Sequence, residues 1–170
     1  MGASFGPVDS LPENYIFANH SAIPAPLDKI LPLFYKSWDD PQSSDGHWYL
    51  DAFAPEAELV FGQRMKGHDA IRAFRTSIIN PKDGPIVDLE HTMGKCFVLP
   101  GAPESGRQEV LVNGTIWYQL KNGVKIEEDY ASLGLFVDQG DGDYKIEFYE
   151  VYVDSLALAT ALKELSQGEP

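Results

Sequence analysis

The sequence has little positive charge. Its 13 Lys and Arg residues face 26 Asp and Glu residues, which gives a formal net charge of −13 at pH 7. Nucleic acids and anionic membrane surfaces both recruit proteins through a cationic footprint, so no nucleic-acid partner and no membrane partner are expected. The sequence also lacks a long apolar run and a basic N-terminus followed by an apolar segment, so it predicts no membrane span and no secretory signal.

Cysteine is nearly absent, since Cys96 is the only one in 170 residues. A single cysteine excludes an intrachain disulfide, and a cytoplasmic or other reducing compartment is the expected location. Cys96 begins the apolar run CFVL, which favours buried packing over reactivity. The four histidines have no metal-ligand spacing, and phosphate-binding glycine loops and nucleophile elbows are missing. We therefore expect no metal and no cofactor.

Three long strands in series, at residues 108–120, 124–138 and 144–153, dominate the second half of the chain. The dipeptide Asn122-Gly123 separates the first two, and this is the strongest short-range signal for a hairpin. Strands so close in sequence must pair in antiparallel fashion. Apolar residues occupy both alternation phases of the last strand, so the sheet is expected to be covered on both faces.

Helices are expected before this meander. Residues 27–38 carry an apolar face with Ile30, Leu33, Phe34 and Trp38 at helical spacing. A proline at position 32 belongs in a first turn, so this helix is expected to start near residue 29 or later.

The remaining expected elements are helices at 47–54, 68–80 and 156–165 and strands at 58–64 and 87–99, the last with a bulge at Gly94. Helices first and a meander after indicate an α+β fold, a cone-shaped curved antiparallel sheet wrapped around N-terminal helices. Residues 1–26 are expected to form an N-terminal arm, and residues 27–170 a single domain.

Four stretches carry a resemblance to a known family: FAPEAELVF at 53–61, GHDAIRAF at 67–74, a strand bearing His91, and YEVYVD at 149–154. Over residues 27–162 the chain resembles the SnoaL-like branch of the nuclear transport factor 2-like superfamily. The resemblance implies a pocket between the concave sheet face and the helices. It also implies a homodimer formed through the convex sheet face.

Individual members of that superfamily can be compared residue by residue. The sequence is similar to scytalone dehydratase at His91-Thr92-Met93-Gly94, and Trp38-Asp39 stands where that enzyme has a Tyr-Asp pair. Ser132 stands where scytalone dehydratase has a pocket amide and ketosteroid isomerase a carboxylic acid. Val151 stands where limonene epoxide hydrolase has a pocket carboxylate.

The expected catalytic residues are His91, Asp39 and Glu128. An imidazole changes charge near neutral pH and suits proton transfer, although a buried histidine can also be bonded to backbone beneath a helix. Asp39 could pair with His91 and hold its tautomer, or could belong to an ordinary helix-ending turn. If Ser132 faces the pocket, as the resemblance implies, strand alternation points Glu128 inward too, where burial would raise its pKa, but strand carboxylates are mostly solvated. Glu150 falls on the convex side by the same alternation, and would become the pocket carboxylate if the register were shifted.

The expected ligand is a small apolar or aromatic molecule, because amphipathic aromatic side chains dominate the predicted cavity. Each of these side chains could instead be plain core. The expected substrate-binding residues are Trp38, Trp48, Tyr49, Tyr118, Tyr130, Ser132, Tyr149 and Val151.

The resulting hypothesis is a cofactor-independent enzyme that performs acid/base chemistry on a polyketide- or terpenoid-like metabolite, as a cyclase, isomerase, dehydratase or epoxide hydrolase. The alternative is a non-catalytic ligand-binding or dimerisation module with the same fold.

Overall fold

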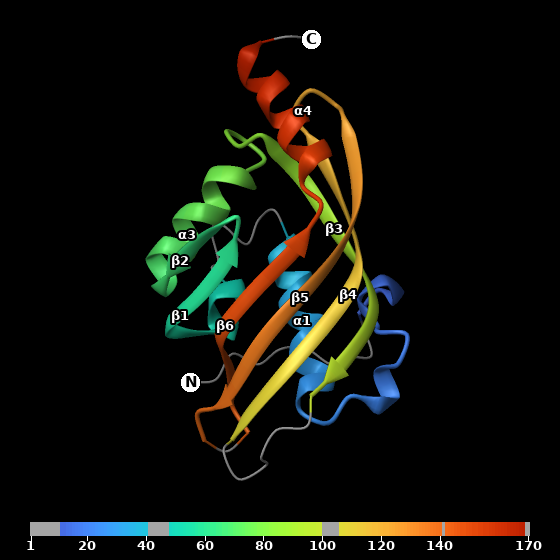
Figure 1. The fold of residues 1–170 in the computed structure, drawn as a ribbon, viewed down its shortest axis with the longest axis vertical. Coiled ribbons are helices and arrows are strands. Elements are labelled where there is room, and N and C mark those ends of the chain that lie inside the picture. Colours follow the sequence, from blue (N-terminus) through green and yellow to red (C-terminus); the bar gives the residue numbers. More distant parts are fainter. Residues whose placement is uncertain (1–10, 41–47, 100–105, 141, 169–170) are drawn as a thin grey trace.

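The computed structural model describes residues 11–40, 48–99, 106–140 and 142–168, and Figure 1 shows helices gathered on a single curved sheet. Within these residues the sheet has six strands in the order β2-β1-β6-β5-β4-β3. The strands are β1 (Phe53–Phe61), β2 (Gln63–Lys66), β3 (Ile86–Val98), β4 (Arg107–Leu120), β5 (Lys125–Asp138) and β6 (Tyr144–Val153). The helices are α1 (Leu27–Asp39), α3 (Gly67–Ile78) and α4 (Leu156–Gln167), with short 3₁₀ turns η2 (Glu13–Tyr15), η3 (His20–Ala22) and η4 (Trp48–Ala52).

The predicted meander of β4, β5 and β6 is confirmed, with antiparallel pairing throughout. Gly123 adopts φ 91° in the turn between β4 and β5, a conformation that glycine accepts without steric cost. One pair departs from the expected antiparallel sheet, because β1 runs parallel to β6. These two strands are far apart in sequence, so no hairpin turn fixes their relative direction.

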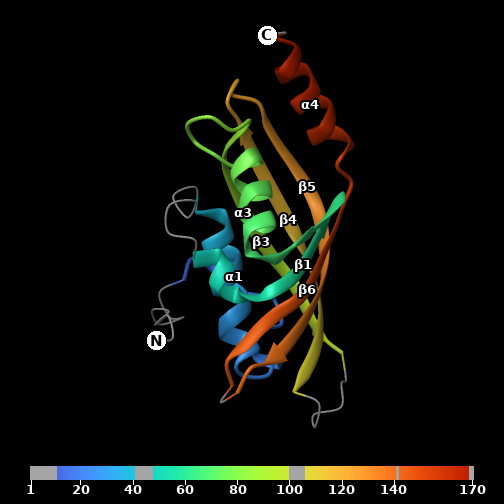
Figure 2. The same ribbon diagram turned by 90° about the vertical axis from the view of Figure 1, so that its left-hand side faces the viewer.

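The sheet curves around α1 and α3, which lie on its concave side, while α4 extends beyond one end (Figure 2). The α+β cone expected from the sequence is therefore present. The predicted bulge in β3 is also present, since the pairing with β4 shifts register between Met93 and Cys96. A Cβ on Gly114 would lie 2.2 Å from the carbonyl oxygen of Thr92, so this close approach of β3 and β4 requires glycine.

Several local expectations are wrong. Helix α1 begins at Leu27 and contains Pro32 in its interior. Of its expected apolar face, Phe34 is buried and Ile30 and Trp38 pack partly against the core, but the buried side also includes Leu27, Leu31, Tyr35 and Asp39, which were not expected there. The burial of Leu27 and Leu31 against the core stabilises this start and compensates for the backbone donor that proline lacks.

The strand expected at 58–64 is divided at Gly62, where φ of 66° turns the chain back and begins β2. The helix expected at 47–54 is shorter, because strand β1 already begins at Phe53. Residue 47 lies outside the described residues.

Residues 11–26 run along the edge of β3. The backbone N–H of Ala18 donates to the carbonyl of Gly94 at 2.8 Å. The side chain of Asn19 donates to the carbonyl of Cys96 at 2.7 Å and accepts from its N–H at 3.0 Å. This segment therefore provides hydrogen-bond partners for backbone groups at the free edge of β3, the strand that carries His91. The domain boundary expected at residue 26 stays a prediction.

The convex face of the sheet mixes polar side chains, such as Glu127 and Asp129, with several exposed large apolar ones. Phe97 and Leu111 are paired across β3 and β4 and are 47% and 39% exposed, and Tyr152 on β6 is 50% exposed. Glu150 accepts a hydrogen bond from the Tyr152 hydroxyl at 2.8 Å, which agrees with its expected position on this face. In the described part of the chain, no helix is both long and apolar enough to cross a membrane.

Candidate active site

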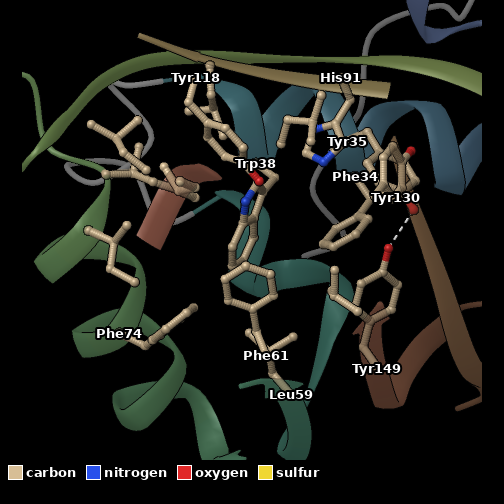
Figure 3. Close-up of a pocket in the computed structure, with 17 residues that line it drawn as sticks. Phe34, Tyr35, Trp38, Leu59, Phe61, Phe74, His91, Tyr118, Tyr130 and Tyr149 are labelled. Carbon is tan, nitrogen blue, oxygen red and sulfur yellow. Dashed lines mark hydrogen bonds between the residues drawn. The ribbon is translucent and has the colours of Figure 1, made fainter. Parts of the chain in front are cut away.

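A pocket lies between the concave face of the sheet and helices α1 and α3 (Figure 3). It holds about 720 Å³ of space free of atoms, which includes the solvent at its mouth. Its aromatic walls are formed by Phe34, Tyr35, Trp38, Tyr118, Tyr130 and Tyr149. Leu, Ile, Val and Phe side chains from β1, α3, β3, β4, β6 and α4 complete the lining, and His91 is its only imidazole.

His91 and Asp39 form a buried pair at one wall. Asp39 is the last residue of α1 and is 3% exposed, while His91 lies in the middle of β3 and is 7% exposed. The imidazole Nδ1 is 2.5 Å from Asp39 Oδ1. The backbone N–H of His91 donates to Asp39 Oδ2 at 2.7 Å, and the Tyr15 hydroxyl donates to the same oxygen at 2.9 Å.

These contacts assign the imidazole tautomer. A carboxylate can only accept hydrogen bonds, so the ring nitrogen that faces Asp39 must carry the proton. The lone pair of neutral His91 then lies on Nε2. Figure 3 shows a ring nitrogen of His91 directed into the pocket, with Tyr35 and Tyr130 next to the imidazole at ring-centroid distances of 5.0 and 4.9 Å. In this arrangement a carboxylate orients one ring nitrogen of His91 and leaves the other without a proton.

Three hydroxyl groups form a closed cluster at the side of the pocket. The Tyr35 hydroxyl lies 2.5 Å from the Tyr149 hydroxyl (Figure 3) and 2.9 Å from Ser132 Oγ, and the Tyr149 hydroxyl donates to Ser132 Oγ at 2.8 Å. Burial raises the pKa of both phenols well above the ordinary value of 10.0. The cluster is therefore neutral, and its three protons are all used in the bonds among its own members, so it can donate to a ligand only when one of these bonds opens.

Full charges are kept out of the pocket. Within the described residues, its lining contains no Lys, Arg, Asp or Glu side chain. The nearby cation Arg75 is buried behind Trp38 and Tyr49, with its guanidinium carbon 5.6 and 4.6 Å from their ring centroids. No group of three or more His, Cys, Asp or Glu side chains in the same described ranges could hold a metal ion. The site thus suits a neutral, largely apolar molecule.

The expected binding residues divide into two sets. Trp38, Tyr118, Tyr130, Tyr149 and Val151 line the pocket, so the strand register inferred from alternation holds. Ser132 lies behind this wall within the hydroxyl cluster, and Tyr49 packs behind Trp38 at a ring distance of 5.3 Å. The side chain of Trp48 lies outside the described part of the structure.

Glu128 is not part of the lining. Its Oε1 accepts a hydrogen bond from the backbone N–H of Leu158 at 3.3 Å, in the first turn of α4. Burial is the main cause that raises the pKa of Glu128, and the bond from Leu158 opposes it. Glu128 is thus placed to hold the start of α4, whose Leu158 side chain closes part of the pocket.

Sequence reasoning missed Tyr15, Tyr35 and Arg75. The four-residue spacing of Leu27, Leu31 and Tyr35 is a helical signal that could have placed Tyr35 on the buried side of α1. Tyr15 and Arg75 had no comparable signal. A tyrosine in a polar N-terminal segment is expected to be exposed, and so is an arginine in an amphipathic surface helix.

Comparison with family models finds no match for this sequence, and comparison with curated proteins finds none either. Solved structures are similar in fold. A putative scytalone dehydratase from Novosphingobium aromaticivorans has a TM-score of 0.63 at 11% identity, over 75% of this chain and 80% of that one. A hexachlorocyclohexane dehydrochlorinase has a TM-score of 0.59 at 10% identity, over 71% and 80%.

Nuclear transport factor 2 from Cryptosporidium parvum has a TM-score of 0.53 at 14% identity, over 72% of this chain and 86% of that one. The chain therefore adopts the nuclear transport factor 2-like fold, as the sequence resemblance implied. This fold includes both enzymes and a transport factor, so the function must be argued from the site itself.

Proposed function

We propose that this protein is a cofactor-independent enzyme in which His91 removes a proton from a neutral, largely apolar small molecule. The observation that carries the proposal is the contact of 2.5 Å between His91 Nδ1 and Asp39 Oδ1, made by a ring that also lines the pocket. Asp39 fixes the tautomer and stabilises the imidazolium that forms when Nε2 takes the proton.

Removal of a proton from carbon leaves an electron pair that must be accommodated. In an elimination this pair forms a carbon–carbon double bond, while the leaving group departs from the adjacent carbon with its bonding electrons. Isomerisation and cyclisation can begin with the same proton transfer and place the charge on a carbonyl oxygen instead. The neutral hydroxyls of Tyr35 and Tyr149 can donate to such an oxygen or leaving group once a bond within their cluster opens, because every proton of the cluster is otherwise engaged.

Elimination is the reaction we favour, on a polyketide- or terpenoid-like substrate. The names of two structural neighbours, a putative scytalone dehydratase and a hexachlorocyclohexane dehydrochlorinase, denote eliminations from cyclic molecules. An aromatic wall without charged side chains supports a substrate of this neutral kind. Glu128 enters the proposal in a supporting role, as the residue that holds α4 over the pocket.

We further propose that two chains associate through the convex face of the sheet. Phe97 and Leu111 lie side by side there, on the edge strand β3 and its neighbour β4, and they expose large apolar surface to water. Burial of this face in a homodimer would remove it from water.

The test is turnover of scytalone, hexachlorocyclohexane and a panel of neutral polycyclic ketones by the wild-type protein and by His91→Gln. His68→Gln is the matched control, because His68 Nε2 bonds to the backbone carbonyl of Phe53 and the residue is not among the described residues that line the pocket. Product is followed by mass spectrometry, with deuterium uptake from D₂O reporting proton removal that does not lead to product.

Loss of about 10²–10⁴-fold in kcat in His91→Gln, with His68→Gln unchanged, is the expected result. Equal turnover by wild type and His91→Gln would contradict the proposal. Tight binding of a panel member without turnover or deuterium uptake would instead favour the non-catalytic binding module.

A further inference from the structure

Arg75 is a buried cation that the mechanism above does not use. It lies on α3 with no exposed surface and stacks on the aromatic rings of Trp38 and Tyr49. Burial lowers the pKa of its guanidinium, and the nearby Tyr49 and Asp39 oppose that effect. A cation held so far from water requires strong partners to remain there.

Those partners are two backbone carbonyls of the α1 C-terminus. Arg75 Nη2 donates to the carbonyl of Trp38 at 2.6 Å and to that of Asp40 at 2.8 Å, and Nε donates to the Trp38 carbonyl at 3.2 Å. The residue between these two carbonyls is Asp39. One guanidinium therefore fixes the backbone on both sides of the carboxylate that contacts His91.

The arrangement is poorly explained by stability alone. Arg75 Nη1 makes no hydrogen bond of good geometry in the described part of the chain, although the nearby Tyr49 favours the charged guanidinium and so raises its pKa. Burial of a cation whose donors are incompletely paired costs free energy that an apolar side chain of similar size would avoid. The last carbonyls of a helix also carry partial negative charge, next to a buried carboxylate, and a cation at this point offsets both.

We propose that Arg75 is a positioning residue that holds Asp39 against His91 by clamping the backbone of Trp38 and Asp40. The inference rests on the proposed function of the His91–Asp39 pair. A carboxylate displaced by about 1 Å would no longer hold the imidazole in one tautomer and orientation, and misplacement of that size can lower a rate by about 10²-fold.

The test uses proton NMR of the full chain and needs no substrate. A short Nδ1–H···Oδ1 hydrogen bond gives a downfield imidazole proton resonance, which is assigned by its loss in His91→Gln. Spectra are compared for wild type, Arg75→Met, Arg75→Lys and Arg72→Met. Arg72 is the matched control, because it lies one turn earlier on α3 and pairs with exposed Asp69.

We expect the resonance in wild type and Arg72→Met, and its loss or upfield shift in Arg75→Met with circular dichroism unchanged. Arg75→Lys keeps the charge but cannot span both carbonyls, so it is expected to behave like Arg75→Met and decides the matter if the methionine variant does not fold. A wild-type resonance in either folded Arg75 variant would overturn the proposal, as would its absence from wild type or its loss in Arg72→Met.

Turnover separates this inference from the proposed function. With a substrate in hand, Arg75→Met is expected to lower kcat by about 10–100-fold with little change in KM. If wild type turns over nothing while the NMR differences are as expected, the proposed function fails and the positioning role stands.

Discussion

Replacement of Asp39 by Asn removes one charge and keeps the shape of the side chain. Asp39 accepts three hydrogen bonds from Tyr15 and from two groups of His91. An asparagine oxygen can still accept the two bonds at Oδ2, but its amide nitrogen must face the imidazole as a donor. His91 Nδ1 then has to accept, and the proton moves to Nε2, where it prevents that nitrogen from acting as a base.

The expected costs differ in size for stability and for rate. Bonds to a charged group contribute about 1.5–3 kcal/mol and neutral ones about 0.5–1.5 kcal/mol, while a buried charge carries a desolvation penalty that asparagine avoids. We therefore expect a loss of about 1–3 kcal/mol in the free energy of unfolding. The rate should fall by about 10²–10⁴-fold, because the base is in the wrong tautomer.

Urea unfolding measures the first quantity and kcat on the substrate identified above measures the second. Asp69→Asn is the matched control, because Asp69 is exposed and pairs only with Arg72 on the same helix. A folded Asp39→Asn variant with the wild-type kcat would refute the assignment of Asp39 as the residue that orients the base.

Three further predictions follow from other contacts. Tyr15→Phe removes the phenol that donates to Asp39, so it should cost about 1.5–3 kcal/mol in urea unfolding and lower kcat; an unchanged midpoint would contradict the contact. Burial raises the pKa of Glu128 from its ordinary 4.5, so its stabilising contribution is present below that value and is lost as pH rises through the raised pKa. The free energy of unfolding of wild type should therefore fall relative to that of Glu128→Gln as pH rises from 4.5. A difference between the two proteins that does not change with pH would contradict the raised pKa of Glu128. Leu111→Glu places a charge on the convex face, so wild type should elute as a dimer in size-exclusion chromatography and the variant as a monomer. A wild-type protein that is also monomeric would contradict the proposed dimer.

The sequence was sufficient for the features that depend on local pattern. The family comparison, extended by strand alternation, placed Tyr118, Tyr130 and Tyr149 on the pocket side, and the Asn-Gly turn indicated the hairpin that carries two of them. The possible pairing of Asp39 with His91 was also accessible, because both positions matched a known relative of the fold.

Features that depend on distant contacts were not accessible. The role of Arg75 arises only when α3 packs against the end of α1, and that of Tyr15 only when the N-terminal segment lies along β3. Glu128 had the predicted inward direction, but its hydrogen-bond partner is a backbone N–H of α4. A contact with a backbone group of another element cannot be predicted from the pattern of side chains. The parallel pairing of β1 with β6 likewise depends on the path of the whole chain.

The central claim is that Asp39 keeps the proton of His91 on Nδ1 and leaves Nε2 free to take a proton inside the pocket. A ¹⁵N–¹H correlation spectrum of the imidazole near neutral pH, assigned with His91→Gln, tests this claim without a substrate. We expect the Nδ1–H tautomer in wild type and its loss in Asp39→Asn. An Nε2–H tautomer in the wild-type protein would contradict it, because that nitrogen could not then act as the base.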